Sequence, residues 1–344
     1  MGRCAVYGLM MGLSMALSGA ALAQTPSLAD KCKDAPAPAT AAKGKKFTTE
    51  VVPVAEDLAY AAFDEGCYVK AMTLAQAAAA RGEAHAFTLI GQMHENGLGV
   101  PPSDAKAAEA YQKGAALGDH HAQFQLGMMF LKGRGVKTDP DAAVTLLEQA
   151  AAKNHSLAQY NLGLIYVEGE ARPQDFARAA ALFEKSAQQD NPRAQFDLAA
   201  MYAAGRGVPQ DLAKAAHWTA LAAKAGLTDA ELEYGVILIH GRRAKLNGVE
   251  VEIVKKDERA GLKYLEAAAE KGSPVAQNRV ARAYRFGVGA DFDPVASAKW
   301  HLLARSSGKS DPLMDLFLAS LPEQTRARAE AEADQWRERR AAEF

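Results

Sequence analysis

The segment AQYNLGLIYVEG, residues 158–169, decides the fold because its pattern returns along the chain at an almost constant spacing. The pattern starts with an alanine, has an apolar residue at the fourth position after it and glycine or alanine at the fifth, and ends with a glycine at the eleventh. The starting alanines are Ala86, Ala122, Ala158, Ala194, Ala230 and Ala276, spaced by 36 residues four times and then by 46. A repeat of this length is typical of solenoids, in which similar units stack side by side.

Each unit is predicted to be a hairpin of two helices. The apolar residues of the first helix share one face, as in a helix that packs on one side. Glycine can adopt the left-handed conformation that ends a helix, and it recurs at Gly97, Gly133, Gly169, Gly205, Gly241 and Gly287. Aspartates suited to cap the second helix follow at Asp104, Asp139, Asp175, Asp211, Asp257 and Asp293. A lone hairpin cannot bury its apolar faces, so the units are predicted to stack into an all-α, right-handed solenoid.

The repeats lie between two less regular ends. Residues 54–83 are predicted to form a degenerate N-terminal hairpin that is broken near Gly66. Residues 312–344 are predicted to form C-terminal capping helices anchored by Trp336. The solenoid is therefore expected to extend from residue 54 to residue 344, because an array of repeats needs caps with polar outer faces.

The N-terminal part of the chain differs in composition from the repeats. Arg3, a mostly apolar run over residues 5–22 and the small residues before Gln24 are typical of a signal peptide, residues 1–23, cleaved after Ala23. An uncleaved anchor is the alternative. Residues 24–53 are rich in Ala, Pro and Lys and are predicted to be a disordered linker. We therefore expect a periplasmic, secreted or cell-surface protein without a transmembrane segment after signal removal.

Two cysteines, Cys32 and Cys67, would be left after signal removal. Disulfides persist in oxidising compartments, and a bond between these residues would tie the N-terminal tail to the first hairpin. Two free thiols are the other interpretation, and the sequence leaves both open. No Cys and His ligand spacing predicts a metal site, and no phosphate-binding glycine loop follows a strand, so no cofactor is predicted.

The charge of the chain argues against nucleic acid as a partner. Forty Lys and Arg residues nearly balance 41 Asp and Glu residues, which leaves a net charge of −1. Binding to nucleic acid depends on clustered cations that neutralise phosphates, and no such cluster is present in the sequence.

The segment 158–169, with GRGVPQD at residues 205–211 and AHW at residues 216–218, closely resembles the Sel-one-like repeat (SLR) family of tetratricopeptide-like solenoids. The resemblance covers about residues 84–309 and implies a helical superhelix. It also implies that the protein resembles adaptors that scaffold complexes. Exported bacterial members often act in envelope signalling, in regulation of surface polysaccharide or in contact with host cells. Unit three departs from the pattern at Ala171 and Arg172, and unit five departs by an insertion.

The concave surface lined by the first helices is the first candidate site, because related solenoids bind ligands there. A strip of apolar residues is predicted on this surface in the middle units, as a groove for a protein or peptide partner. The alternative is that the same side chains pack one first helix onto the next. The residues are Phe124, Met128, Tyr160, Leu164 and Phe196.

The insertion in unit five, within residues 242–257, is the second candidate site. Asn247 and Gly248 precede an alternation of Val249, Val251 and Ile253, which is a signal for a β-hairpin. The strand could offer an edge to a partner. An elongated loop folded onto the solenoid is the alternative.

Catalytic and metal patterns are weak. Ser103 and Lys106 have the Ser-x-x-Lys spacing of acyl-serine enzymes, but Ser103 lies where a helix begins, so capping explains it better. His85 and His121 are expected to be neighbours on the groove wall. The sequence thus predicts a non-catalytic scaffold or regulator in the bacterial cell envelope that binds a protein or peptide. The alternative is an enzyme or binding protein acting on envelope polymers, either β-lactamase-like or polysaccharide-binding.

Overall fold

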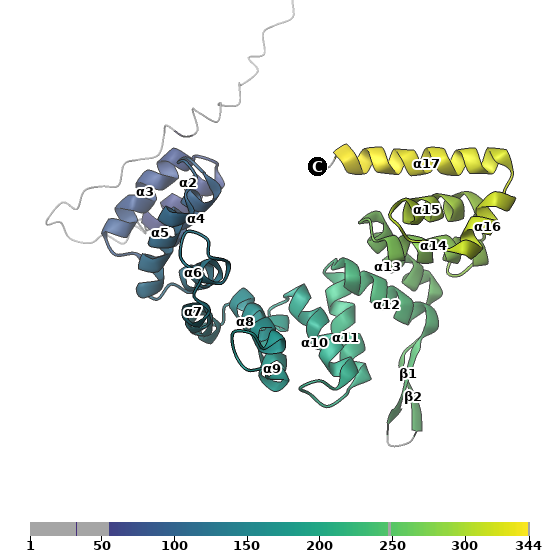
Figure 1. Cartoon of the computed structure of the whole chain (residues 1–344), viewed down its shortest axis with the longest axis horizontal. Coiled ribbons are helices and arrows are strands. Elements are labelled where there is room, and N and C mark those ends of the chain that lie inside the picture. The colour runs from purple at the N-terminus through teal and green to yellow at the C-terminus, as the bar shows by residue number, and fades with distance from the viewer. Residues whose placement is uncertain (1–31, 33–54, 247–248, 343–344) are drawn as a thin grey trace, which may run out of the picture.

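The computed structural model describes residues 32, 55–246 and 249–342, which form an open arch of helices (Figure 1). From α2 to α15, each helix packs against the next one along the chain. The protein is therefore an all-α solenoid, as predicted. The signal peptide predicted for residues 1–23 and all of the predicted linker except Cys32 lie outside the described residues.

Most helices of the six units are 13 residues long, and each unit has a first helix and a second helix. The first helices are α4 (Ala84–Asn96), α6 (His120–Lys132), α8 (Ser156–Glu168), α10 (Pro192–Ala204), α12 (Thr228–His240) and α14 (Pro274–Phe286). The second helices are α5 (Asp104–Ala116), α7 (Pro140–Ala152), α9 (Phe176–Ala187), α11 (Leu212–Lys224), α13 (Glu258–Glu270) and α15 (Pro294–Ser306). The flanking elements are α2 (Ala55–Asp64), α3 (Tyr68–Ala80), α16 (Pro312–Ser320) and α17 (Glu323–Ala342).

The glycines that end the first helices behave as the pattern predicts, with one exception. Gly241 after α12 has φ 69° and ψ 167°, which directs the chain into a β-strand instead of a helical cap. The other five adopt the left-handed conformation, with φ between 65° and 79°: Gly97, Gly133, Gly169, Gly205 and Gly287.

Side-chain caps start the second helices. Asp139, Asp175, Asp211, Asp257 and Asp293 each accept a hydrogen bond from a backbone amide of the first turn. The prediction for Asp104 was wrong, because Ser103 caps α5 and accepts from the Lys106 amide. The cap follows the helix-ending glycine by six residues in every unit except the fifth, which carries the insertion, and in unit one Ser103 occupies that place. Asp104 is the first helical residue instead.

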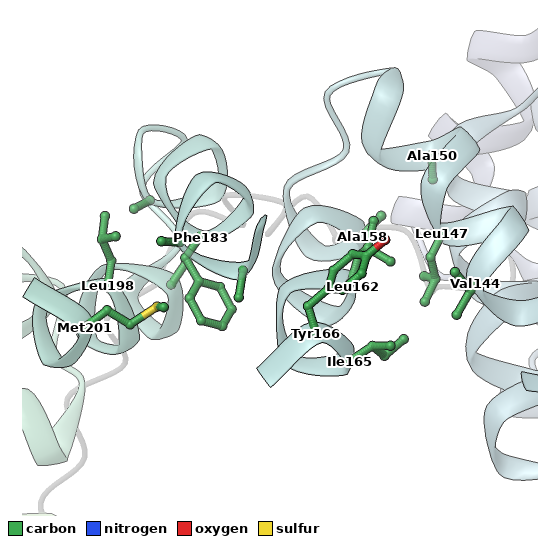
Figure 2. Close-up of a cluster of buried hydrophobic side chains, with 14 of the residues drawn as sticks. Val144, Leu147, Ala150, Ala158, Leu162, Ile165, Tyr166, Phe183, Leu198 and Met201 are labelled. Carbon is green, nitrogen blue, oxygen red and sulfur yellow. The ribbon is translucent and has the colours of Figure 1, made fainter. Parts of the chain in front are cut away.

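The two helices of a hairpin approach closely where the first one carries its small residue. A methyl group on Gly91 would lie 2.5 Å from a ring carbon of Tyr111, and one on Gly163 would lie 2.6 Å from a ring carbon of Phe183. Both rings are buried. Figure 2 shows part of the central cluster, in which Leu162, Phe183 and Leu198 of successive helices pack between the helices. Glycine at this position therefore makes room for the aromatic residue of the second helix.

A row of buried glutamines, which the sequence patterns did not identify, joins each unit to the one before. Each side-chain amide donates to a backbone carbonyl near the end of the preceding second helix, at 3.1–3.4 Å. The glutamines directly follow the starting alanines and are at most 4% exposed: Gln123, Gln159, Gln195 and Gln277. Unit five has Glu231 at this position, and the Lys271 ammonium lies 2.7 Å from its carboxylate. The junction thus has a buried polar side chain in all five cases.

Both ends of the solenoid are covered. At the C-terminal end, the Trp336 ring of α17 packs against Trp300, with ring centroids 6.4 Å apart, and its Nε1 donates to Glu270 at 2.6 Å. At the N-terminal end, α2 and α3 form a further hairpin. A disulfide joins Cys32 to Cys67 at the start of α3, with 5.4 Å between the Cα atoms. The N-terminal tail is therefore tied to the array at Cys32.

The insertion in unit five forms an antiparallel hairpin of β1 (Arg242–Leu246) and β2 (Val249–Val254). Leu246 is paired with Val249, and the two turn residues between them lie outside the described residues. Figure 1 shows the hairpin pointing away from the hollow of the arch. The insertion therefore adds a separate surface rather than a wall of the hollow.

The buried glutamines predict a measurable loss of stability on substitution. Gln195→Ala removes a buried hydrogen bond and leaves a small cavity at the junction, so we expect a loss of about 1–2 kcal/mol. Chemical denaturation followed by circular dichroism measures the change, with Gln112→Ala on the exposed face of α5 as the matched control. Equal denaturation midpoints for the two variants would contradict a stabilising role for the row.

Candidate functional site

The first helices of successive units form the inner surface of the arch. Units of a curved array approach most closely on its inner side, so contacts between first helices mark that side. The Tyr160 hydroxyl of α8 donates to Asp197 of α10 at 3.0 Å. The Asn278 amide of α14 donates at 2.9 Å to Asp311, which caps α16. We call this surface, which includes the residues at the second and sixth positions after each starting alanine, the groove.

The aromatic residues predicted for the groove serve mainly as packing between units. Phe124 is 9% exposed, and its ring stacks on His155 at a centroid distance of 4.8 Å. The Tyr160 ring lies 5.6 Å from Phe183, and Phe196 packs on the buried alanines at the next junction. These side chains are buried or half-buried, so little of their surface is available to a ligand.

The predicted residues Met128 and Leu164 are half-buried and line pockets in the groove. The first, which we call the α6 pocket, has a volume of about 160 Å³ and is lined by Glu95, Phe124, Gln125, Met128, Met129, Lys132 and Arg134. The second, which we call the α8–α10 pocket, has a volume of about 200 Å³. It is lined by Leu164, Val167, Phe176, Phe183, Asp197, Ala200, Met201 and Arg206. The predicted strip thus supplies two residues of the α6 pocket, Phe124 and Met128, and one of the α8–α10 pocket, Leu164, and it missed the rest of their walls.

The α8–α10 pocket combines an apolar wall with two charged groups. Six of its side chains are aliphatic, aromatic or thioether groups, which suit an apolar ligand group. Asp197 accepts from the Tyr160 hydroxyl, and burial raises the pKa of its carboxyl. Burial, together with the charge of Asp197, raises the pKa of Tyr160 to about 12. The second charge is the guanidinium of Arg206, whose carbon lies 5.1 Å from the centre of the Phe176 ring.

Two further pockets extend the row. A polar pocket of about 320 Å³ near the N-terminal end is lined by Tyr60, Thr88, Gln92, Tyr111, His121 and Gln125. A mixed pocket of about 190 Å³ near the C-terminal end includes Val236, Ile239 and Phe286 with the cations Arg279 and Arg282. The lining of the groove therefore varies along its length, from polar near the N-terminal end to apolar in the middle and mixed near the C-terminal end, which suits an extended ligand more than a small molecule.

A histidine pair occupies the wall of the groove beside α6. The Ala158 amide donates to Nδ1 of His155, which caps α8, and Nε2 of His155 lies 3.1 Å from Nδ1 of His121. Because Nδ1 of His155 is an acceptor, its Nε2 carries the proton and donates to His121. Burial, and then the charges of His121 and His120, lower the pKa of His155 to about 4. The expected proximity of His85 and His121 stays a prediction, and the structure pairs His121 with His155, the cap of the following helix.

The other candidate residues from the sequence lie at a helix cap and on the hairpin. The Ser103 hydroxyl accepts from the Lys106 amide, so the Ser-x-x-Lys spacing coincides with a helix cap. On the hairpin, Val249 and Val251 are 64% and 39% exposed, and Ile253 is half-buried. Over the described residues, no group of three or more His, Cys, Asp or Glu side chains is arranged to hold a metal ion. In the same part of the chain, no helix is both long and apolar enough to cross a membrane.

The repeats match a known family, and the fold matches solved structures. The family model of the Sel1 repeat matches residues 86–119, 120–155, 156–191, 192–227, 229–273 and 274–309. A Sel1 repeat protein from Oxalobacter formigenes has a TM-score of 0.63 at 24% identity, over 74% of this chain and 100% of that one. A protective antigen of uropathogenic Escherichia coli with an SLR fold has a TM-score of 0.51 at 27% identity, over 79% of this chain and 64% of that one. None of the curated proteins matches the chain.

The histidine cap makes a prediction about pH. Above pH 6.5, His155 is neutral in both the folded and the unfolded chain. Between about pH 6.5 and pH 4 only the unfolded chain takes up its proton, so stability falls as pH falls. His155→Asn keeps a cap, as Asn191 does for α10, and removes this titration.

Thermal unfolding at pH 7.5 and pH 5 measures the effect. We expect the drop in midpoint between the two values to be smaller for His155→Asn than for the wild type. The control is His217→Asn at an exposed position of α11, which should keep the wild-type drop. Identical drops in all three proteins would contradict the role of His155.

Proposed function

The chain belongs to the Sel1 repeat family, and we propose that it is a non-catalytic scaffold or regulator that binds a protein or peptide partner in its groove. Proteins built from these repeats generally act by binding other proteins. The observation that carries the proposal is the row of pockets along the groove, above all the apolar α8–α10 pocket. Apolar pockets between the units of a curved array are suited to anchor side chains of an extended partner.

The groove favours a polypeptide ligand for a physical reason. The pockets of about 160 Å³ and 200 Å³ each have room for one side chain, and they follow one another along the first helices. An extended or helical peptide presents side chains at regular intervals and can fill such a row. A small molecule would fill one pocket and leave the others in contact with water.

We place the protein outside the cytosol, in the bacterial cell envelope or at the cell surface. The support is the signal-like composition of residues 1–23 together with the bond between Cys32 and Cys67. Structural disulfides form and persist where the medium is oxidising, as in the bacterial periplasm. A partner is therefore to be sought among envelope or surface proteins.

The hairpin is a second contact surface within this proposal. Its exposed valines stand on a two-stranded sheet, and such a sheet has unpaired edge strands that can accept a strand from a partner. Because the hairpin points away from the hollow, it would hold a different part of the partner than the groove does.

A substitution in the groove tests the main proposal. Ala200→Glu adds bulk and charge to the α8–α10 pocket at an exposed position, so the fold should be kept while partner binding is lost. Ala181→Glu, exposed on α9, makes the same chemical change outside the pocket. Affinity capture from envelope extracts with cross-linking and mass spectrometry should recover the same proteins with the wild type and with Ala181→Glu only.

Two results would contradict the proposal. One is a partner that is captured equally well by Ala200→Glu. The other is the absence of any reproducible protein partner combined with measurable binding of purified protein to peptidoglycan or polysaccharide, which would favour a role on envelope polymers. Circular dichroism spectra of the variants establish that each is folded.

The contribution of the hairpin is tested by deleting residues 245–254. We expect the deletion variant to keep its helical content and to capture the partner less efficiently than the full chain. Retention of every partner at wild-type yield would dismiss the hairpin as a contact surface and leave the groove proposal untouched.

A further inference from the structure

We propose that the α8–α10 pocket recognises a peptide segment in which an apolar side chain stands next to an aspartate or glutamate. The apolar side chain would enter the pocket, and the neighbouring carboxylate would pair with Arg206. This inference rests on the proposed function of the groove, and it specifies the chemistry of the partner at one place.

Two arginines lie at the same position of the repeat in units two and four. Arg134 in unit two and Arg206 in unit four each stand between the two glycines of the loop that leaves the first helix. The two loops contact the preceding unit in the same way. The second glycine of the loop in unit two, Gly135, lies against the backbone carbonyl of Asp104, and that of unit four, Gly207, lies against the backbone carbonyl of Phe176. The surroundings of the two side chains can therefore be compared residue by residue.

In unit two the arginine is neutralised inside the protein. The Arg134 guanidinium lies 3.0 Å from the Glu95 carboxylate and 2.6 Å from the Asp104 carboxylate. Its hydrogen bonds to Asp104 lower the pKa of that carboxyl. The charge of Arg134 is thus already paired with two carboxylates of the protein and does not attract an acidic ligand.

The carboxylates that face Arg134 come from unit one, and around Arg206 the matching positions of unit three carry apolar side chains. Val167 occupies the position of Glu95, and Phe176 occupies the position of Asp104. Within the described parts of the chain, no carboxylate lies within salt-bridge distance of Arg206. Its guanidinium lies over the face of the Phe176 ring instead. The same two replacements add Val167 and Phe176 to the apolar wall of the pocket and leave the Arg206 guanidinium at its edge without a carboxylate partner.

The pocket has one carboxylate of its own, Asp197, but this group does not neutralise Arg206. Its Oδ2 accepts from the Tyr160 hydroxyl, and the recorded contacts leave its other oxygen available as an acceptor. A bound peptide has backbone N–H groups that can donate to such an oxygen. The pocket therefore offers three complementary features to a peptide: an apolar cavity, an acceptor for N–H and a cation for a carboxylate.

The cavity of about 200 Å³ suits a single leucine, methionine or phenylalanine side chain. A guanidinium can bind a carboxylate with two parallel hydrogen bonds, which adds direction as well as strength. Because the apolar wall lies directly beside the guanidinium, the acidic residue has to be close to the apolar one in the peptide. A basic residue at that place would be repelled by Arg206.

The test is a selection from a library of random heptapeptides displayed on phage, with the full-length mature protein as bait. We expect enrichment of peptides that carry a large apolar residue within two positions of Asp or Glu. A synthetic copy of the enriched peptide is then titrated by fluorescence anisotropy. Arg206→Ala should weaken its binding by about tenfold or more, and added salt should weaken binding to the wild type.

Two further variants separate the role of the charge from that of the fold. Val167→Glu combined with Phe176→Asp rebuilds the carboxylate clamp of unit two around Arg206, so the acidic peptide should bind poorly although the arginine is present. Arg206→Glu should shift the selection toward peptides with Lys or Arg beside the apolar residue. Arg259→Ala, at an exposed position of α13, is the control and should bind like the wild type.

The possible outcomes are distinct. Peptides that bind the wild type but lack acidic residues, or that bind Arg206→Ala equally well, would overturn this inference and leave the groove as a peptide site. No enrichment of any peptide on the folded wild-type protein would count against the inference and the proposed function together. Loss of binding in Arg206→Ala and in the rebuilt clamp, with binding kept in Arg259→Ala, supports the inference.

Discussion

No hairpin of this chain can bury its apolar faces alone, and the rest of the structure depends on that constraint. Each first helix gives one face to its own second helix and another to the preceding unit. Gly91 and Gly163 admit the rings of Tyr111 and Phe183 on the first of these faces. Buried glutamines such as Gln159 and Gln195 hold the second face to the preceding unit. Both contacts recur in the array, so the units stack into an arch. Pockets between the first helices make its inner surface a groove.

The same constraint decides which positions are free for function. Residues that keep a constant offset in the repeat are committed to packing, and Phe124 with Tyr160 are examples on the groove itself. A site needs positions where one unit differs from the next without a loss of packing. At Glu231 the difference is compensated internally by Lys271. At Val167 and Phe176 the acidic residues of the other unit are replaced by apolar ones. Arg206 therefore lies beside an apolar cavity without a carboxylate partner among the described residues.

Only part of the site could be predicted from the sequence, because the pocket combines residues of several repeat units. Leu164 and Met128 were identified because they belong to the apolar strip of a single helix. Arg206, Asp197 and Phe176 were missed, since the pocket is assembled from α8, α9, α10 and a loop, and no single segment of sequence contains it. A comparison of the Gly-x-Gly loops between units would have revealed that Arg206 had lost the acidic residues that accompany Arg134.

The sequence by itself determined the helical units, their boundaries and their stacking, because glycine ends and polar caps are local features and the spacing repeats them. It also indicated the hairpin of unit five through its Asn-Gly pair and alternating strand. Only the tertiary structure decided which residues face the groove and which neutralise one another. Those relations join residues about 30 positions apart, as Arg134 is joined to Asp104. Whether two charges meet across such a distance depends on how one unit is seated on the next, which no local pattern specifies.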